Sequence, residues 1–267
     1  MTVQARAPSG INQDIAQPLV CLLLQGNKQV SIGTDTICLG PGDSLLITAD
    51  VPMVSQITKA SPDEPYLSLV MNLNPAVIAE LTMEMDAAPV ADGLDIRSEP
   101  TDTEVADAAL RVMNLLDRPG SIPILHSQLI RELHYWLLAG RHGNAIRRLG
   151  TPDSHAQRVA RAVAVLRANY DKTLPVDHLA SIAGMSPSTF HHHFREITSL
   201  SPRQFQKQLR LIEARRKLLA EGITASSAAF AVGYESVSQF TREYGRFFGL
   251  PPGKDIEALK NQTAAVA

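Results

Sequence analysis

Between residues 18 and 73, the chain consists of short apolar runs separated by turn residues. Three of these runs are PLVCLLLQG, SLLITADVP and PYLSLVMNL, and they are bounded by Gly, Pro, Asn and Asp. The tetrapeptide GPGD at 40–43 has the composition of a turn. Short β-prone segments with such boundaries are typical of antiparallel sheets. We therefore predict a small antiparallel sandwich or barrel for this part of the chain.

Helical spacing of the apolar residues begins after Asn74 and Pro75. It is brief in 75–85 and then extends over 101–117 and 122–139. The segment 101–117 leads into a Pro-Gly pair that ends the helix, and 122–139 has the broader apolar stripe. These segments predict a helical hairpin that packs on the sheets or on a second subunit.

Residues 139–154 mix Gly, Pro, Ser and charged residues without periodicity, as is typical of a domain boundary. We therefore divide the chain into domains 1–145 and 146–267. Beyond the boundary the chain is helical throughout, and we predict helices over 154–169, 176–183, 187–198, 203–220, 224–231, 237–248 and 254–260.

The second half contains an internal duplication, because 179–202 aligns with 228–252. Phe190 pairs with Phe240 in this alignment, and each copy has a short helix, a glycine turn, an N-cap serine and a second helix. This order of features is typical of a helix-turn-helix unit. We predict two such units, at 176–198 and 224–248.

The stretch SPSTFHHHFRE at 186–196 suggests a metal site at first sight. Consecutive residues lie ~100° apart around a helix, so three adjacent histidines cannot converge on one ion as an i, i+4 pair does. We therefore predict no metal. Phe190 and Phe194 mark the buried face, which places His193 near it as a packing residue. The outward residues are predicted to contact DNA bases in the major groove, and they are Ser188, His191 and His192.

The same projection in the second unit predicts base contacts by Val237, Ser238, Thr241 and Arg242. Arg242 suits a bidentate contact to guanine, with phosphate binding as the alternative, and Val237 suits a thymine methyl. Basic residues that flank these helices are expected to contact phosphates or to be merely solvated, and they are Arg195, Arg203, Lys207, Arg210 and Arg246.

The formal net charge of −2 conceals a division along the chain. Residues 1–140 hold 7 Lys and Arg against 17 Asp and Glu, whereas residues 141–267 hold 18 against 10. An acidic half joined to a basic half indicates a polyanion-binding module attached to another domain. Solvated basic helices without a polyanion partner are the alternative.

Two cysteines, Cys21 and Cys38, are too few for a disulfide scaffold or a four-cysteine zinc site. Both lie in apolar strand-like contexts, so we expect buried free thiols, with a thiol sensor as the alternative. No apolar run approaches the ~20 residues that cross a bilayer, and the first residues lack the apolar core of a secretory signal. We expect a cytoplasmic protein without membrane contact.

Residues 155–252 resemble the DNA-binding domain of AraC/XylS-family transcription regulators. The matching stretches are LASIAGMSPSTFHHHFRE, SPRQFQKQLRLIEARRKLL and AAFAVGYESVSQFTREYGRFFGLPP, which occur in the family's order. The resemblance implies that both helix-turn-helix units contact bases. The end of the domain departs from the family, because PPGKDIEALK lacks the usual aromatic residue and Arg after the proline. The packing of the last helix is therefore the open question.

The stretches LLLQGNKQVSIG, GPGDSLLITADVPM and SPDEPYLSLVMNLNP resemble the cupin-like sensor domain of one AraC subgroup over roughly 15–135. The fold expected is α+β with two domains: a cupin-like β-barrel with a helical hairpin, then an all-α domain. The resemblance implies a sequence-specific regulator, in the family's usual mode an activator working with RNA polymerase. We further expect a small-molecule effector in the barrel, no cofactor, and a homodimer through 101–139.

An enzyme is the rival from another class. A cupin metal site needs His and carboxylate ligands on strands, yet His126 is the first histidine and lies beyond the predicted barrel. The chain also has no nucleophile elbow, P-loop or dinucleotide fingerprint. We predict that the protein is not an enzyme, and a constitutive DNA-binding regulator without an effector stays the alternative.

Overall fold

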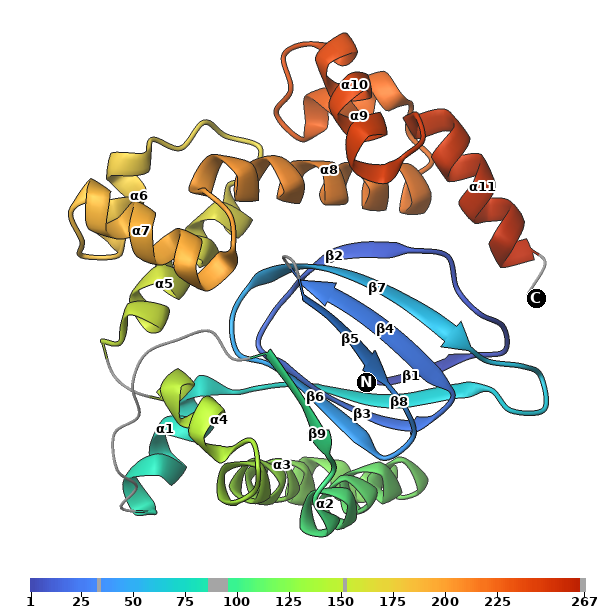
Figure 1. The fold of residues 1–267 in the computed structure, drawn as a ribbon, viewed down its shortest axis with the longest axis vertical. Coiled ribbons are helices and arrows are strands. Elements are labelled where there is room, and N and C mark those ends of the chain that lie inside the picture. Colours follow the sequence, from blue (N-terminus) through green and yellow to red (C-terminus); the bar gives the residue numbers. More distant parts are fainter. Residues whose placement is uncertain (33–34, 86–95, 151–152, 265–267) are drawn as a thin grey trace.

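The apolar runs of the N-terminal half form the strands of two antiparallel sheets in the computed structural model (Figure 1), which describes residues 1–32, 35–85, 96–150 and 153–264. One sheet has the strand order β1-β8-β3-β6-β9, and the other has the order β2-β7-β4-β5. The strands are β1 Thr2–Ala5, β2 Asn12–Ala16, β3 Leu19–Gln25, β4 Asn27–Ile32, β5 Asp35–Leu39, β6 Asp43–Ile47, β7 Val51–Lys59, β8 Tyr66–Asn72 and β9 Ile96–Pro100.

The N-terminal domain is therefore a cupin-like sandwich of two sheets, and the predicted barrel is corrected in this respect. Among the described residues, no strand hydrogen-bonds from one sheet to the other. The edge strand β9 was missed because its sequence, IRSEP, has no apolar run. It pairs with β6, where Leu45 lies opposite Ser98.

Alternation along each strand fills the space between the sheets. Cys21 and Leu23 of β3, with Tyr66 of β8, lie in the core between the sheets. Val20 and Leu22 point the other way, toward the helices. The buried thiol expected for Cys21 is confirmed, whereas Cys38 on β5 is exposed and that expectation was wrong.

Four helices cover the outer face of the first sheet (Figure 1). They are α1 Pro75–Glu84, α2 Thr103–Met113, α3 Ile122–Ala139 and α4 Gly143–Gly150, with 3₁₀ turns η1 Asn114–Asp117 and η2 Pro119–Ser121 between α2 and α3. The segment 139–154, which we interpreted as a domain boundary because it lacks periodicity, thus contains α4. Gly150 lies against α1 so closely that a Cβ would come within 2.9 Å of Ile78 Cγ2, which explains the glycine.

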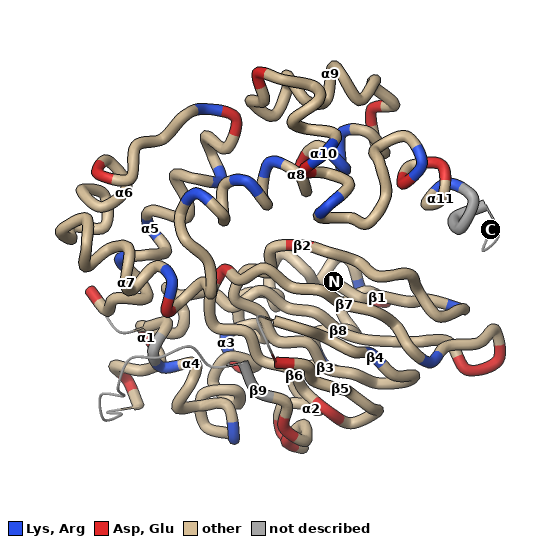
Figure 2. The backbone as a smooth tube through the Cα atoms, turned by 45° about the horizontal axis from the view of Figure 1, so that its top comes forward, with Lys and Arg blue, Asp and Glu red and all other residues tan. Residues whose placement is uncertain are grey.

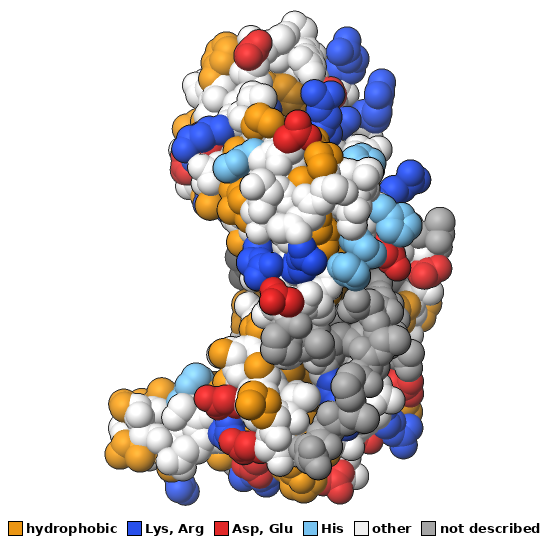
Figure 3. All heavy atoms as spheres, turned by 90° about the vertical axis from the view of Figure 1, so that its left-hand side faces the viewer, with side chains coloured by type: hydrophobic (Ala, Val, Ile, Leu, Met, Phe, Trp, Pro, Cys, Tyr) orange, Lys and Arg blue, Asp and Glu red, His pale blue; other side chains and the backbone are white. Residues whose placement is uncertain are grey.

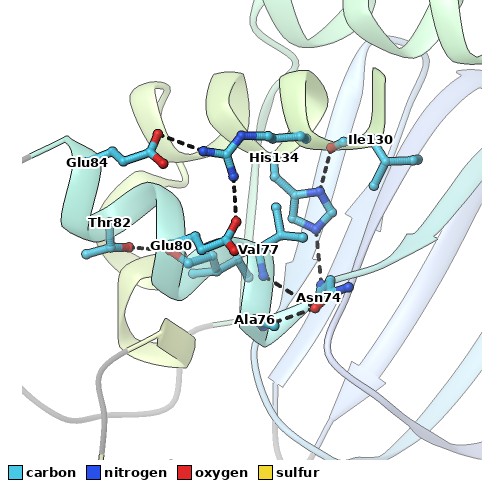
Figure 4. A network of polar contacts seen from close by, with 10 residues as sticks. Asn74, Ala76, Val77, Glu80, Thr82, Glu84, Ile130 and His134 are labelled. Atoms are coloured by element: carbon cyan, nitrogen blue, oxygen red, sulfur yellow. Dashed lines mark hydrogen bonds and ion pairs between the residues drawn. The ribbon is translucent and has the colours of Figure 1, made fainter. Parts of the chain in front are cut away.

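A polar network joins α1 to α3 (Figure 4). Asn74 caps α1 with its side chain, and its backbone N–H donates to His134 Nε2 at 3.1 Å. The other ring nitrogen of His134, Nδ1, donates to the Ile130 carbonyl at 2.7 Å. Arg131 forms ion pairs with Glu80 and Glu84 of α1. These bonds leave His134 as a neutral, buried imidazole, and burial lowers its pKa.

The C-terminal domain is helical throughout, as predicted, and its last helix is longer than expected. The helices are α5 His155–Ala168, α6 Val176–Ile182, α7 Pro187–Thr198, α8 Pro202–Ala220, α9 Ala225–Ala231, α10 Val237–Phe248 and α11 Pro252–Ala264. The pairs α6–α7 and α9–α10 form the two helix-turn-helix units. Their turns contain Gly184 and Gly233, both with positive φ. No helix among the described residues is long and apolar enough to span a membrane.

Candidate nucleic-acid interface

Helix α7 presents the predicted polar residues on one exposed surface. Ser186 caps the helix by accepting from the Thr189 N–H, and Phe190 and Phe194 are fully buried on the inner side. The outer side forms a shallow hollow that is lined by Ser188, His191, His192, Arg195 and Glu196. The structure therefore brings together all three residues predicted to read bases in the first unit, together with one predicted phosphate contact. Figure 3 shows histidine side chains gathered on this face of the molecule.

His193 lies at the edge of this surface and packs against α5. Its ring stacks on that of His155, with centroids 3.8 Å apart and an interplanar angle of 15°. Its Nδ1 lies 3.0 Å from Glu196 Oε2. The packing role expected for His193 agrees with this position, but sequence reasoning missed both partners. Among the described residues, His192, His193 and Glu196 are the group whose ligand atoms lie close enough to hold a metal ion.

Helix α10 exposes only part of the predicted set. Ser238 and Arg242 are exposed, whereas Val237 packs partly against the core of the second unit. The Thr241 hydroxyl donates to the Val237 carbonyl at 2.9 Å. The solvent-facing candidates of this helix are therefore Ser238 and Arg242.

Arg210 of α8 connects the segment after α5 to the second helix-turn-helix unit. Its guanidinium donates to the carbonyls of Tyr170, Asp171 and Lys172 after α5, and to the Gly233 carbonyl in the second unit at 2.9 Å. These bonds engage the group that was predicted to contact phosphate. A Cβ at Gly233 would overlap the Asp171 carbonyl oxygen, so the turn requires glycine for space as well as for its φ.

Four other predicted phosphate contacts are exposed, namely Arg195, Arg203, Lys207 and Arg246. Several Lys and Arg residues lie along α8, which connects the two units (Figure 2). At ~1.5 Å per residue, a helix of 19 residues spans ~28 Å, near the ~34 Å between successive major grooves on one face of DNA.

The last helix is held by a buried ion pair that sequence reasoning did not find. Arg215 of α8 donates two hydrogen bonds to Asp255 of α11, at 2.9 and 2.8 Å, and also lies over the Phe248 ring. The Tyr244 hydroxyl donates to the same carboxylate at 2.7 Å, and burial raises the pKa of Tyr244. Asp255 thus holds α11 against α8 and α10, although this sequence lacks the aromatic residue and Arg that usually follow the proline in the family.

A mostly apolar pocket lies where the sandwich meets α5. Its empty volume is about 510 Å³, part of which opens to solvent. Lining residues from the sandwich include Thr48, Ala49 and Asp50, and those from the helices include Val159, Ala160, Val163 and Ile197. A molecule bound in this pocket would contact both halves of the chain.

Two protein families match this chain. The family described as AraC-type transcriptional regulator N-terminus matches residues 1–145, and a helix-turn-helix domain family matches residues 179–257. The first match extends over more than half of the chain and includes the whole sandwich with α1 to α3.

Curated relatives match mainly in the helical half. GbdR, an HTH-type transcriptional regulator of Pseudomonas aeruginosa, is 30% identical over 104 residues, which is 39% of this chain and 28% of GbdR. RclR, an RCS-specific HTH-type transcriptional activator of Escherichia coli, is 35% identical over 32% of this chain and 30% of its own length. VirF, a virulence regulon transcriptional activator of Yersinia enterocolitica, is 28% identical over 52% of this chain and 51% of its own length. The chain thus spans at most about half the length of these relatives.

Solved structures of ToxT from Vibrio cholerae have the same overall fold. A crystal structure of wild-type ToxT with a bound unsaturated fatty acid superposes with a TM-score of 0.64, covering 96% of this chain and 92% of ToxT. The sequences are 9% identical, so this similarity concerns the fold alone.

Proposed function

Because the chain belongs to the AraC-type transcriptional regulators, we propose that it activates transcription at promoters that its two helix-turn-helix units recognise by base sequence. One observation carries this proposal. Helices α7 and α10 each expose polar residues near their N-termini, and Arg210 of α8 donates to four carbonyl groups, one in the turn of the second unit and three in the segment just before the first. Two reading helices joined by the ~28 Å helix α8 suit successive major grooves, which lie ~34 Å apart on one face of DNA.

The base-reading residues in this proposal are Ser188, His191 and His192 in the first unit, and Ser238 and Arg242 in the second. Val237 and Thr241 contribute from partly covered positions. Arg195, Arg203, Lys207 and Arg246 contact phosphates, which supplies most of the affinity and makes it depend on salt. We assign Arg210 a positioning role instead, because its guanidinium is engaged with protein carbonyls.

An apolar small molecule is the proposed effector, and we place it in the pocket beside α5 rather than between the sheets. Fully buried side chains such as Leu23, Leu39 and Ile47 fill the core between the sheets. A ligand in the pocket would contact Ala49 and Val163 together, and so would bind differently in different arrangements of the two domains. Such differential binding is what regulation requires. The fatty acid named for the ToxT structure supports an apolar ligand class.

Dimerisation and contact with RNA polymerase complete the proposal. Leu110, Leu116, Ile124 and Leu125 are exposed large apolar residues on α2, η1 and α3, within 101–139. A second copy of the chain covering them would remove apolar area from water. A thiol sensor would use the exposed Cys38 rather than the buried Cys21.

DNA selection from a random pool tests the DNA-reading part. The full-length protein should enrich a motif with two blocks about one helical turn apart, at both low and high salt. Enrichment of no motif, with binding that simply disappears as salt rises, would instead indicate a non-specific polyanion binder.

Thermal-shift screening with fatty acids and other apolar metabolites tests the effector part. Ala160 lines the pocket, whereas Ala164 lies one helical turn later on α5 and is also exposed. An effector that raises the melting temperature of the wild type and of Ala164→Leu should not stabilise Ala160→Leu. Equal stabilisation of both variants would place the effector elsewhere.

A further inference from the structure

Two of the three consecutive histidines meet at one carboxylate. His193 Nδ1 lies 3.0 Å from Glu196 Oε2, and His192 Nε2 lies 4.0 Å from the same oxygen. One ligand atom from each of the three residues falls within 4.8 Å of the others. The hollow in front of them opens to solvent.

Helical spacing explains this arrangement. Glu196 follows His192 by four residues and His193 by three, so both imidazoles lie on the side of α7 where the carboxylate projects. The three histidines alone do not converge on one point, because consecutive residues lie ~100° apart around the helix. A carboxylate one turn later supplies the point at which two of them meet.

The three groups have the chemistry of a transition-metal site. Imidazole nitrogen and carboxylate oxygen are common ligands of Zn²⁺, and three protein ligands with a water are typical of its open sites. His193 is already fixed by its stack on His155, and its side chain is only 19% exposed. His192, at 76% exposure, is free to turn toward an incoming ion. His193 is thus already in position to bind an ion, and His192 completes the site by turning toward it.

We propose that His192, His193 and Glu196 bind a divalent transition-metal ion of the Zn²⁺ class on the outward surface of α7. The ion binds the unprotonated imidazole nitrogens and the carboxylate oxygen. The site itself does not depend on DNA binding.

A consequence for DNA follows, and it rests on the proposed function. An ion that holds His192 removes this imidazole from the bases, while the second unit stays unchanged. Zn²⁺ should therefore relax the sequence preference at positions that α7 reads and leave the positions that α10 reads as they are.

The test uses untagged full-length protein and Zn²⁺ alone, in competition with a chromophoric chelator, with Co²⁺ absorption as a second readout. His191 is the matched control, since it belongs to the same histidine run and is exposed but lies outside the cluster. We expect one equivalent of Zn²⁺ in the wild type and in His191→Ala. In His192→Ala and Glu196→Gln the affinity should fall at least about tenfold, a loss that even changes to outer-shell residues cause.

Three results would overturn the site: no Zn²⁺ binding in the wild type, equal affinity in all four proteins, or an equal loss in His191→Ala. His192 and Glu196 are exposed, so these variants are expected to fold, which circular dichroism checks. Because the titration contains no DNA, its failure is separate from failure of the proposed function. A selected motif that does not change with Zn²⁺ would refute the consequence for α7 alone.

Discussion

Arg167 of α5 donates from Nε to Asp50 Oδ1 at 2.9 Å, which joins the helical domain to the segment between β6 and β7. The same guanidinium donates to the Ile15 carbonyl of β2 at 3.2 Å. Burial raises the pKa of Asp50, and the Arg167 charge opposes that rise. Because Asp50 also lines the pocket beside α5, this ion pair lies where an effector would act on the contact between the domains.

Breaking the pair should weaken the contact between the domains measurably. In a double-mutant cycle of Asp50→Ala and Arg167→Ala, we expect a coupling free energy of about 1 kcal/mol or more in urea unfolding, because both side chains are mostly shielded. Arg161 and Asp153 form the control pair, at 3.4 Å and largely exposed, and their coupling should be near zero. Equal coupling in the two cycles would mean that the interdomain pair contributes no more than a surface contact.

His134 predicts a loss of stability on mild acidification. Burial lowers its pKa in the folded state, so below the ordinary histidine value the unfolded chain binds a proton that the folded chain does not. The free energy of unfolding therefore falls as pH drops from about 7 to about 5.5. Melting temperatures across this range should decrease more in the wild type than in His134→Gln, which has no titrating group. Parallel pH profiles would show that His134 does not titrate in this way.

Asp255 should be essential for the stability of the second unit. Asp255→Ala leaves the Arg215 charge buried without its partner, which costs about 3–5 kcal/mol of unfolding free energy. Glu221→Ala removes the exposed partner of Lys217 on the same helix and should cost at most about 0.5 kcal/mol. Chemical denaturation of both variants checks this difference. Similar losses would contradict the role of Asp255 in holding α11.

Arg210 and Arg203 should differ although both lie on α8. Arg210→Ala removes charged hydrogen bonds to backbone carbonyls and should cost at least about 2 kcal/mol of stability. Arg203→Ala should leave stability unchanged and lower the salt-dependence slope of DNA binding by about 1. Unfolding curves and binding at several salt concentrations measure both effects. A reduced salt slope in Arg210→Ala at unchanged stability would return Arg210 to the phosphate contacts.

Much of the fold was predictable because local signals were strong. The duplicated glycine turns and the N-cap residues Ser186 and Ser236 predicted both helix-turn-helix units to within a residue or two. The helix α4 and the strand β9 were missed for a physical reason: α4 follows two glycines, β9 has a mainly polar sequence, and tertiary packing selects their conformations.

The candidate site was predictable only in part. Exposure along α7 followed from the buried positions of Phe190 and Phe194. The carbonyl contacts of Arg210 and the stack of His155 on His193 join residues far apart in sequence. No periodic pattern reports such contacts, because they depend on how the helices pack.

Selection of DNA by Arg242→Ala, beside the wild type and Arg203→Ala, tests the central claim of paired base reading most directly. We expect Arg242→Ala to relax the preference at one position of the block read by α10, at a cost of about 1–3 kcal/mol for the wild-type sequence. Arg203→Ala should keep the motif and weaken all sequences alike. A motif that is unchanged in Arg242→Ala, with uniformly weaker binding, would contradict base reading by this residue and make it a phosphate contact.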